Sequence, residues 1–373
     1  MFLQRLQLNQ FKNCLNADLV FSPKINCFVG NNGAGKTNIL DAVYYLSFCK
    51  SYFNPTDQQN IMHEKEFFGI HGTYFRNGNE PDQVSCVQKK NVKKSFRFNK
   101  KEYERLADHI GKFPLVMISP YDRDLINEGS DMRRKFIDGV ISQFDPIYLD
   151  ELITYNKALL QRNTLLKQFA ENRYFDQDLL TIWDTQLVRS GGIIHEKRKS
   201  ILVSFLPLFN HYYRIVSNQG ETVSIQYDSD LHDKDMHDLL INCQTADRQA
   251  RYTTKGIHKD ELVFLIDGFQ LKRFGSQGQQ KSFVIAIKLA QFEYTRQLMN
   301  YKPILLFDDI FDKLDDQRVE QLINLVGEDS FGQVFITDTQ LHRIELLFQH
   351  TSIHHKIFRV HSGVVDENVY SVS

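Results

Sequence analysis

The sequence predicts a mixed α/β fold that is divided by an inserted, mainly helical lobe. An apolar run at 25–29 passes through a glycine-rich turn into helical spacing at 37–48. A second apolar run, at 304–307, ends in two aspartates, and the first of them follows Lys36 by 272 residues. Between these segments, from 121 to 215, apolar residues recur at helical spacing with few glycines. The chain therefore combines two α/β segments, far apart in sequence, with a helical insertion.

Length and composition indicate a globular protein. The 373 residues correspond to roughly two or three domains. Hydrophobic and charged fractions of 42% and 24% exclude a disordered chain, a collagen and a small disulfide scaffold. A net charge of −1 excludes a uniformly basic nucleic-acid coat but allows a local basic patch. The cysteines form no C-x-x-C pair, and no apolar run reaches signal-peptide or membrane-spanning length, so we expect a cytoplasmic protein without a membrane partner.

Strands dominate the first 120 residues. The opening residues alternate between apolar and polar side chains, which is the period of a strand. A later buried run stops at Pro120, as expected before a proline. The predicted elements are strands within 1–11, at 19–21 and at 25–29, a helix at 37–48, strands and turns over 67–106, and a strand at 113–118.

Helices dominate the middle of the chain, and α/β patterning returns after it. Pro207 predicts the end of the helical stretch. The elements predicted beyond it are strands at 223–227 and 262–266, a turn at Asp267-Gly268, a helix at 282–298, and strands at 304–307 and 333–337. We therefore assign residues 1–120 and 245–373 to one domain and residues 121–244 to the inserted lobe.

A phosphate-binding loop is predicted between the strand at 25–29 and the helix that follows. The residues are Gly30, Asn31, Asn32, Gly33, Ala34, Gly35, Lys36 and Thr37, which match the pattern GxxxxGK[ST]. The glycines let successive N–H groups point at phosphate oxygens, and the helix adds its positive N-terminal end. Lys36 is predicted to contact the β- and γ-phosphates of ATP, and the Thr37 hydroxyl to bind Mg²⁺. The alternative is a glycine-rich turn that binds nothing.

Two carboxylates are predicted to complete the catalytic site. The run 304–307 is a buried strand, and Asp308 and Asp309 follow it at the edge where open α/β sheets bind ligands. Asp308 is predicted to hold Mg²⁺, and Asp309 to polarise the attacking water, with Lys36 as the other catalytic residue. The alternative is a strand that ends in two solvated acids.

A second anion-binding turn precedes a later helix. Ser276, Gly278 and Gln279 form a Ser-x-Gly-x-Gln turn that opens this helix. Because one nucleotide does not need two phosphate cradles from one subunit, we expect this turn to contact the nucleotide of a second subunit. The alternative is a polar, N-capped helix.

A basic run is the candidate DNA-binding surface. Seven basic residues without an acid occur between 89 and 101, with two phenylalanines among them. They are Lys89, Lys90, Lys93, Lys94, Arg97, Lys100 and Lys101. On a hairpin they would present a positive edge to phosphates, although such runs are often only solvated. The run 133–135 is a second candidate, and the histidines at 350, 354, 355 and 361 are more typical of packing or surface positions than of a metal site.

The order of these motifs resembles that of ABC-type P-loop ATPase heads, and more closely the RecF family of bacterial recombination-mediator ATPases. The resemblance rests on the segments 9–13, 30–38, 119–125, 129–136, 256–262, 276–281 and 304–315. The resemblance implies that Asn38 belongs to the nucleotide site and that Leu314-Asp315 lies in a loop that contacts the second subunit of a dimer. The sequence departs from the family at Lys12 and Lys259, where arginine is usual, at Ile257, where proline is usual, and after Thr337, where no switch histidine follows.

This resemblance implies an ABC-type head with a helical lobe, ATP-dependent homodimerisation, slow DNA-stimulated hydrolysis and DNA binding. It also implies work with the RecO and RecR mediator proteins in recombinational and gap repair of damaged DNA. Two other functions remain open from the residues alone: an ATPase subunit of a transporter-type motor, and a nucleotide-gated scaffold with negligible turnover. Whether single-stranded, gapped or duplex DNA is preferred does not follow from the sequence.

Overall fold

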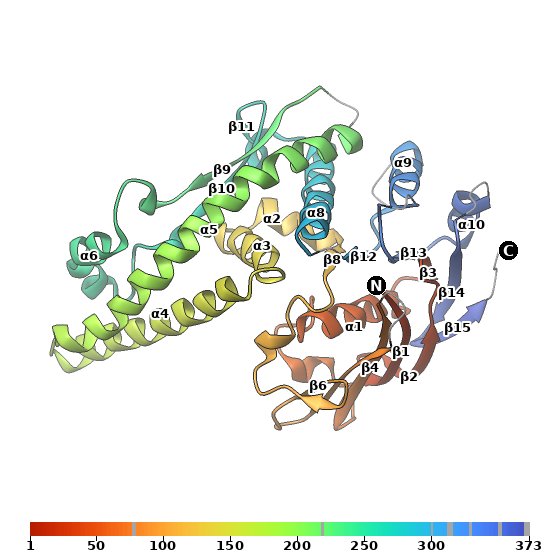
Figure 1. Cartoon of the computed structure of the whole chain (residues 1–373), viewed down its shortest axis with the longest axis horizontal. Helices are drawn as coiled ribbons and strands as arrows, with labels where there is room; N and C mark the ends of the chain where they lie inside the picture. The colour runs from red at the N-terminus through yellow and green to blue at the C-terminus, as the bar shows by residue number, and fades with distance from the viewer. Residues whose placement is uncertain are drawn as a thin grey trace. The chain divides into compact units, whose positions relative to one another are not determined.

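The protein forms two compact units (Figure 1). The computed structural model describes residues 1–76, 80–217, 220–299, 301–311, 316–327, 330–349 and 353–368. Unit 1 comprises Met1–Tyr121 and Gln291–Ser373, and unit 2 comprises Asp122–Ala290. The contacts group residues 245–290 with the helices of unit 2, whereas the sequence assigned them to the nucleotide-binding domain; that assignment stays a prediction.

Unit 1 contains two six-stranded sheets. The first is antiparallel, with the strand order β2-β1-β4-β5-β6-β7. Its strands are β1 (Phe2–Phe11), β2 (Cys14–Val20), β4 (Phe67–Phe75), β5 (Asp82–Lys89), β6 (Ser95–Phe98) and β7 (Lys101–Glu102). Side chains of β1 alternate between the core and solvent, as the sequence predicts: Leu6 and Leu8 are buried, and Gln7 between them is exposed.

The second sheet has the order β15-β14-β3-β13-β12-β8 and is parallel except for the β14/β15 hairpin. Its strands are β3 (Ile25–Val29), β8 (Leu115–Ile118), β12 (Ile304–Phe307), β13 (Val334–Asp338), β14 (His355–His361) and β15 (Val364–Asn368). All side chains of β3, β12 and β8 are buried, as expected for parallel strands covered on both faces. The carboxyl ends of β3, β12 and β13 therefore meet at one edge.

Unit 1 also contains helices. They are α1 (Lys36–Phe48), the part of α8 (Gln277–Met299) from Gln291 on, α9 (Asp316–Gly327) and α10 (Leu341–Gln349). Helix α1 contacts strands of both sheets, and its residues Leu40 and Leu46 are fully buried in the shared core. Phe28 and Phe335 belong to the same core. The helix that begins at the phosphate loop is therefore fixed on both sides by packing.

Unit 2 is mainly helical and contains one small sheet. Its elements are α2 (Asp124–Asn127), α3 (Ser130–Ser142), α4 (Pro146–Asn172), α5 (Gln177–Ser217), β9 (Val223–Asp228), α6 (Met236–Ala250), β10 (Glu261–Ile266), β11 (Phe269–Gln270), α7 (Leu271–Phe274) and the first part of α8 (Gln277–Met299). The long helices α4 and α5 pack along each other (Figure 1). The strands form an antiparallel sheet in the order β11-β10-β9.

The prediction that helical structure would break at Pro207 was wrong. Helix α5 continues through this residue to Ser217. Proline removes the N–H that would bond to the carbonyl of Val203. Val203 is 72% exposed, so this turn of the helix lies at the surface, where water can satisfy a carbonyl that lacks its helical partner. On the opposite side of the helix, fully buried Phe205 and Phe209 hold it against the core of unit 2.

Candidate nucleotide-binding site

The glycine-rich loop connects β3 to α1 in a shape that its glycines make possible. Gly33 and Gly35 have φ angles of +79° and +116°, which L-residues with side chains rarely adopt. Gly30 is required for a different reason: a Cβ atom there would lie 2.1 Å from the carbonyl oxygen of Val360 in β14. Asn31 and Asn32 are exposed between them. The loop thus has its N–H groups on a tight, accessible turn at the N-terminus of a helix.

Lys36 is turned toward its own loop. Its Nζ donates to the carbonyl oxygens of Gly30, at 2.9 Å, and Asn31, at 3.2 Å. The residue is only 3% exposed. The ammonium group is therefore held at the centre of the loop, beside the turn that was predicted to hold phosphates.

Asn13 forms hydrogen bonds with the phosphate loop and with the helix that follows it. The sequence did not predict it as a site residue. Its Nδ2 donates to the carbonyl oxygen of Ala34 at 3.1 Å, and its Oδ1 accepts from Asn38 Nδ2 at 2.7 Å. A Cβ atom on Gly35 would meet the Asn13 side chain at 2.8 Å. The only signal in the sequence was that Asn13 lies in one of the segments that carry the family resemblance.

The structure brings Thr37 and Asp308 together. Thr37 Oγ1 donates to Asp308 Oδ1 at 2.8 Å, although the two residues are 271 positions apart. Asp309 lies beside them: its Oδ1 is 4.0 Å from Lys36 Nζ. Its φ of +44° turns the backbone sharply after β12. The predicted Mg²⁺ ligands and both predicted catalytic residues therefore lie in one site.

Thr337, at the end of β13, links the two aspartates. Its hydroxyl lies 3.0 Å from Asp308 Oδ1 and 3.2 Å from Asp309 Oδ1, and it accepts the backbone N–H of Asp309 at 2.8 Å. The next residue is Asp338, and no switch histidine follows it. Asp338 is buried, and its carboxylate pairs with Arg343 at 2.7 Å. Neither residue was predicted for the site, because their position follows only from the pairing of β13 with β3 and β12.

Burial dominates the electrostatics of Asp308. Burial and, to a smaller extent, the neighbouring charge of Asp309 raise the pKa of this carboxyl, and hydrogen bonds from Thr37 and Thr337 and the charge of Lys36 lower it. The net result is a pKa of about 6. A divalent cation would offset the same desolvation. Mg²⁺ fits the hydroxyl and carboxylate oxygens of Thr37 and Asp308, because it takes hard oxygen ligands and needs only one or two from the protein beside phosphates and water.

Lys12 forms a buried ion pair near the loop. Its Nζ is 2.7 Å from Asp41 Oδ2 and lies over the rings of Phe11 and Phe53. Asp41, fully buried on α1, also accepts from Ser51 Oγ at 2.6 Å. The residue that stands in place of the family arginine is therefore anchored to the helix that begins at the phosphate loop.

The turn at 276–280 is the N-terminal cap of α8, in unit 2. Ser276 Oγ accepts from the N–H of Gln279 at 3.2 Å, and the Gln279 side chain accepts from the N–H of Ser276 at 2.7 Å, which together form a capping box. Ser276 is exposed. The structure thus contains the N-capped helix of the simpler alternative, and contact with a second subunit's nucleotide stays a prediction. Leu314-Asp315 lies outside the described residues.

The basic run forms the β5–β6 hairpin and the turn to β7, but its side chains are not equivalent. Lys94 Nζ donates to the carbonyl of Cys49 at 2.6 Å and pairs with Asp57 at 2.8 Å, so its amine points to the interior. Lys90 pairs with Glu66 and Arg97 with Glu102 at the surface. The remaining members of the run are exposed: Lys89, Lys93, Lys100 and Lys101. DNA contact by this run stays a prediction.

The second basic candidate, 133–135, is largely engaged inside unit 2. Arg133 makes two hydrogen bonds to Glu261, at 2.7 and 2.8 Å, and Arg134 donates to the carbonyl of Asp260 at 2.6 Å. Among the described residues, no group of three or more His, Cys, Asp or Glu could hold a metal ion. Of the C-terminal histidines, His354 contacts Ser22 at 2.9 Å and His355 packs on Phe348, and position 350 lies outside the described residues.

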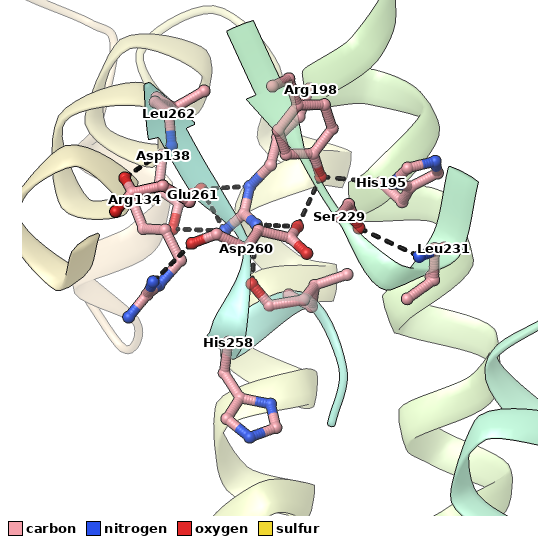
Figure 2. A network of polar contacts seen from close by, with 12 residues as sticks. Arg134, Asp138, His195, Arg198, Ser229, Leu231, His258, Asp260, Glu261 and Leu262 are labelled. Carbon is pink, nitrogen blue, oxygen red and sulfur yellow. Dashed lines mark hydrogen bonds and ion pairs between the residues drawn. The ribbon is translucent and has the colours of Figure 1, made fainter. Parts of the chain in front are cut away.

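The segment 256–262 holds unit 2 together through a buried polar network (Figure 2). Arg198 from α5 pairs with Asp138 of α3 and with Asp260, each at 2.9 Å, and also donates to the carbonyl of Ile257. His258 lies 2.8 Å from the hydroxyl of Tyr155 in α4, and burial lowers its pKa to about 4. Asp260, Glu261 and His258 of this segment therefore all have partners within unit 2.

Comparisons with known proteins agree over nearly the whole chain. The family model for the RecF/RecN/SMC N-terminal domain matches residues 2–363. The DNA replication and repair protein RecF of Phocaeicola vulgatus is 49% identical over 368 residues, which cover 98% of each chain. The protein of the same name from Flavobacterium johnsoniae is 51% identical over 360 residues, 96% of this chain and 100% of that one. A solved structure of the recombination mediator protein RecF-ATPrS in the RecFOR pathway matches with a TM-score of 0.89 at 27% identity, covering 99% of this chain and 98% of that chain. Across the described ranges, no helix is both long and apolar enough to cross a membrane.

Proposed function

The chain belongs to the RecF family, and on that premise we propose that it is an ATP-dependent DNA-binding protein of recombinational and gap repair. ATP binding drives two heads together on DNA, and slow hydrolysis releases them. The relatives named above support the repair role, and the RecF structure matched with ATPrS supports the nucleotide. RecO and RecR are the protein partners that the RecFOR pathway suggests, and the bacterial cytoplasm, where chromosomal DNA lies, is the place of action.

The observation that carries this proposal is the 2.8 Å contact between Thr37 and Asp308 beside Lys36. A glycine-rich turn alone occurs in many proteins, whereas a phosphate loop whose last hydroxyl meets a buried carboxylate from another strand is the arrangement of a Mg²⁺–nucleotide site. The cation, when bound by Thr37 and Asp308, would supply charge neutralisation for the phosphates. The N–H groups of 31–36 would hold the phosphates, and Lys36 would exchange its loop carbonyls for phosphate oxygens.

Asp309 is the residue that we assign to water activation. Its carboxylate lies next to the phosphate loop rather than on it, and its backbone N–H is tied to Thr337. A carboxylate held in this way can orient a water molecule and accept its proton. Aspartate tolerates the left-handed φ of this position better than most residues do. Because the backbone N–H and the carboxylate of Asp309 both contact the Thr337 hydroxyl, changes at Thr337 would misplace the base.

The DNA-binding part of the proposal uses the exposed lysines of the β5–β7 region. Lys93, Lys100 and Lys101 are exposed and have no acid between them in sequence. Phosphate contacts release counterions, so the affinity for duplex DNA should fall with salt by a slope of about −0.9 per contact. Lys94 serves as an internal contrast, because its amine pairs with Asp57.

The test is sedimentation velocity of the full chain with and without ATP, Mg²⁺ and a gapped duplex. We expect a monomer without nucleotide, a dimer with ATP, and faster dimer formation on DNA. Thr37→Val should remain a monomer with ATP, while Thr37→Ser, which keeps the hydroxyl, should behave like the parent. Sedimentation that does not respond to ATP, or equal behaviour of the two variants, would exclude the proposed switch.

A further inference from the structure

Unit 2 contains a hollow that the proposed ATPase cycle does not use. It lies where the end of α4, the residues after it and α6 come together, and its volume is about 560 Å³. Ligand pockets in proteins span about 300–1,000 Å³. The lining includes Leu166, Phe169, Arg173, Phe175 and Arg248.

The floor of the hollow is apolar and largely buried. Leu166 is 1% and Phe169 is 8% exposed, and with Leu180 they form a small core of their own. Phe175 packs on this core with its ring 5.4 Å from that of Phe169. An apolar side chain that entered here would meet preformed aromatic and aliphatic surface rather than having to create it.

The rim carries two available cations. Arg248 lies over the ring of Phe175, with its guanidinium carbon 4.1 Å from the ring centre. Arg173 ends α4 in a left-handed conformation, with φ of +51°, and its N–H donates to Phe169, so its backbone is fixed. In the part of the chain that the structure describes, neither arginine has a carboxylate partner, and both are exposed. Two guanidinium groups beside an apolar floor match a ligand that carries carboxylates next to an apolar group.

We propose that this hollow is a docking site for an acidic peptide segment of a partner protein. An aromatic or aliphatic side chain of the segment packs on the partly exposed Ala170 and Phe175 above this core, and its carboxylates bind Arg173 and Arg248. Thr245 and Gln249 of α6 also line the hollow and offer hydrogen bonds to the peptide backbone. The proposal is independent of ATP and of the dimer.

The same features fit nucleic acid less well. Single-stranded DNA is bound by open aromatic faces along a positively charged groove. Here the face of Phe175 is covered by Arg248, and the hydroxyl of Tyr174 is bonded to Asp176, an acid next to the hollow. Two isolated guanidinium groups make no continuous positive groove for a phosphate backbone, whereas each of them can bind one carboxylate of a peptide.

The test is fluorescence anisotropy with the full chain and a fluorescein-labelled peptide. The probe is a decapeptide of aspartate and glutamate that ends in leucine and phenylalanine with a free carboxylate. Three comparison probes separate the contributions: one with lysines in place of the acids, one with two terminal alanines, and a labelled oligothymidylate. We expect saturable binding of the first probe and a loss of at least about tenfold for each of the other peptides.

Matched variants locate the site. Arg173→Gln with Arg248→Gln should weaken binding of the acidic probe at least about tenfold. Lys199→Gln with Lys234→Gln removes the same charge from exposed positions elsewhere in unit 2 and should leave binding unchanged. Absence of saturable binding, equal weakening in both double variants, or tighter binding of the oligothymidylate would overturn the proposal. Urea unfolding of each variant, followed by tryptophan fluorescence, shows that the fold is retained.

Discussion

Arg198→Met should destabilise unit 2 by about 3–5 kcal/mol, the range for removing one partner of a buried ion pair. The structure sets this magnitude: the side chains of Arg198 and Asp260 are each 2% exposed, and that of Asp138 is 15% exposed. Methionine fills much of the arginine volume but donates no hydrogen bond. The two carboxylates would be left without their cation, and the carbonyl of Ile257 would lose a donor.

The assay can report unit 2 alone. Trp183 is the single tryptophan of the chain and lies in α5, the helix that carries Arg198. Its fluorescence therefore follows the unfolding of unit 2 in urea. With a slope of about 2 kcal/mol/M, the expected loss moves the midpoint down by about 1.5–2.5 M. Arg198→Lys keeps the charge without the planar fork and should fall between the parent and the methionine variant.

The matched control is the neighbouring substitution Lys199→Met. Lys199 is exposed on the same helix, so its replacement should change stability by no more than about 0.5 kcal/mol. If Arg198→Met moved the midpoint no further than this control, the buried ion pairs would not be what stabilises unit 2. Combining Arg198→Met with Asp138→Asn and Asp260→Asn should recover part of the loss, because the uncompensated charges are then removed.

Three further predictions concern protonation, hydrolysis and dimerisation. The folded pKa of His258, about 4, is below its ordinary value of 6.5, so its contribution to the stability of unit 2 is present above pH 6.5 and is lost as the pH falls toward 4; His258→Gln should flatten this part of the Trp183 midpoint profile, and parallel profiles would contradict the assignment. Asp309→Asn should bind ATP and prolong the dimer while phosphate release falls, whereas turnover at the parental rate would make Asp309 structural. Ser276→Arg should bind ATP as a monomer in equilibrium dialysis and sedimentation, and loss of nucleotide affinity in the monomer would argue against a role in the second subunit.

The parts of the site that could be predicted from the sequence are those encoded locally. The phosphate loop is a continuous strand–turn–helix segment, and Asp308 and Asp309 directly follow an apolar run, so short-range patterns were enough. The contributions of Asn13 and Thr337 could not be predicted in this way. Their roles depend on which strands are neighbours: β13 pairs with both β3 and β12, and this pairing is what brings a threonine hydroxyl between two aspartates.

Charge patterns were less informative than chemical motifs, for a physical reason. A count of basic residues does not show which ammonium groups face solvent. Lys94 stands among exposed lysines in sequence, yet its amine reaches Asp57 and the carbonyl that ends α1 at Cys49. Pro207 shows the same limit for backbone rules, since α5 continues through it on a turn that has exposed Val203 on one side and buried Phe205 on the other.

The nucleotide site needs both sequence segments of unit 1, which the inserted unit 2 separates in the chain. The phosphate loop rests on the last strands of unit 1: Gly30 passes so close to Val360 that only hydrogen fits, and Gly363 donates its N–H to the carbonyl of Ala34 at 2.8 Å. A Cβ atom on Gly363 would in turn lie 2.1 Å from the carbonyl oxygen of Asn13. The loop therefore reaches its shape only when residues more than 300 positions apart are paired, and non-local contacts of this kind are typical of slow folding. The residues of the site thus come from both ends of the chain: the phosphate loop from its beginning, and Asp308, Asp309 and Thr337 from its last fifth.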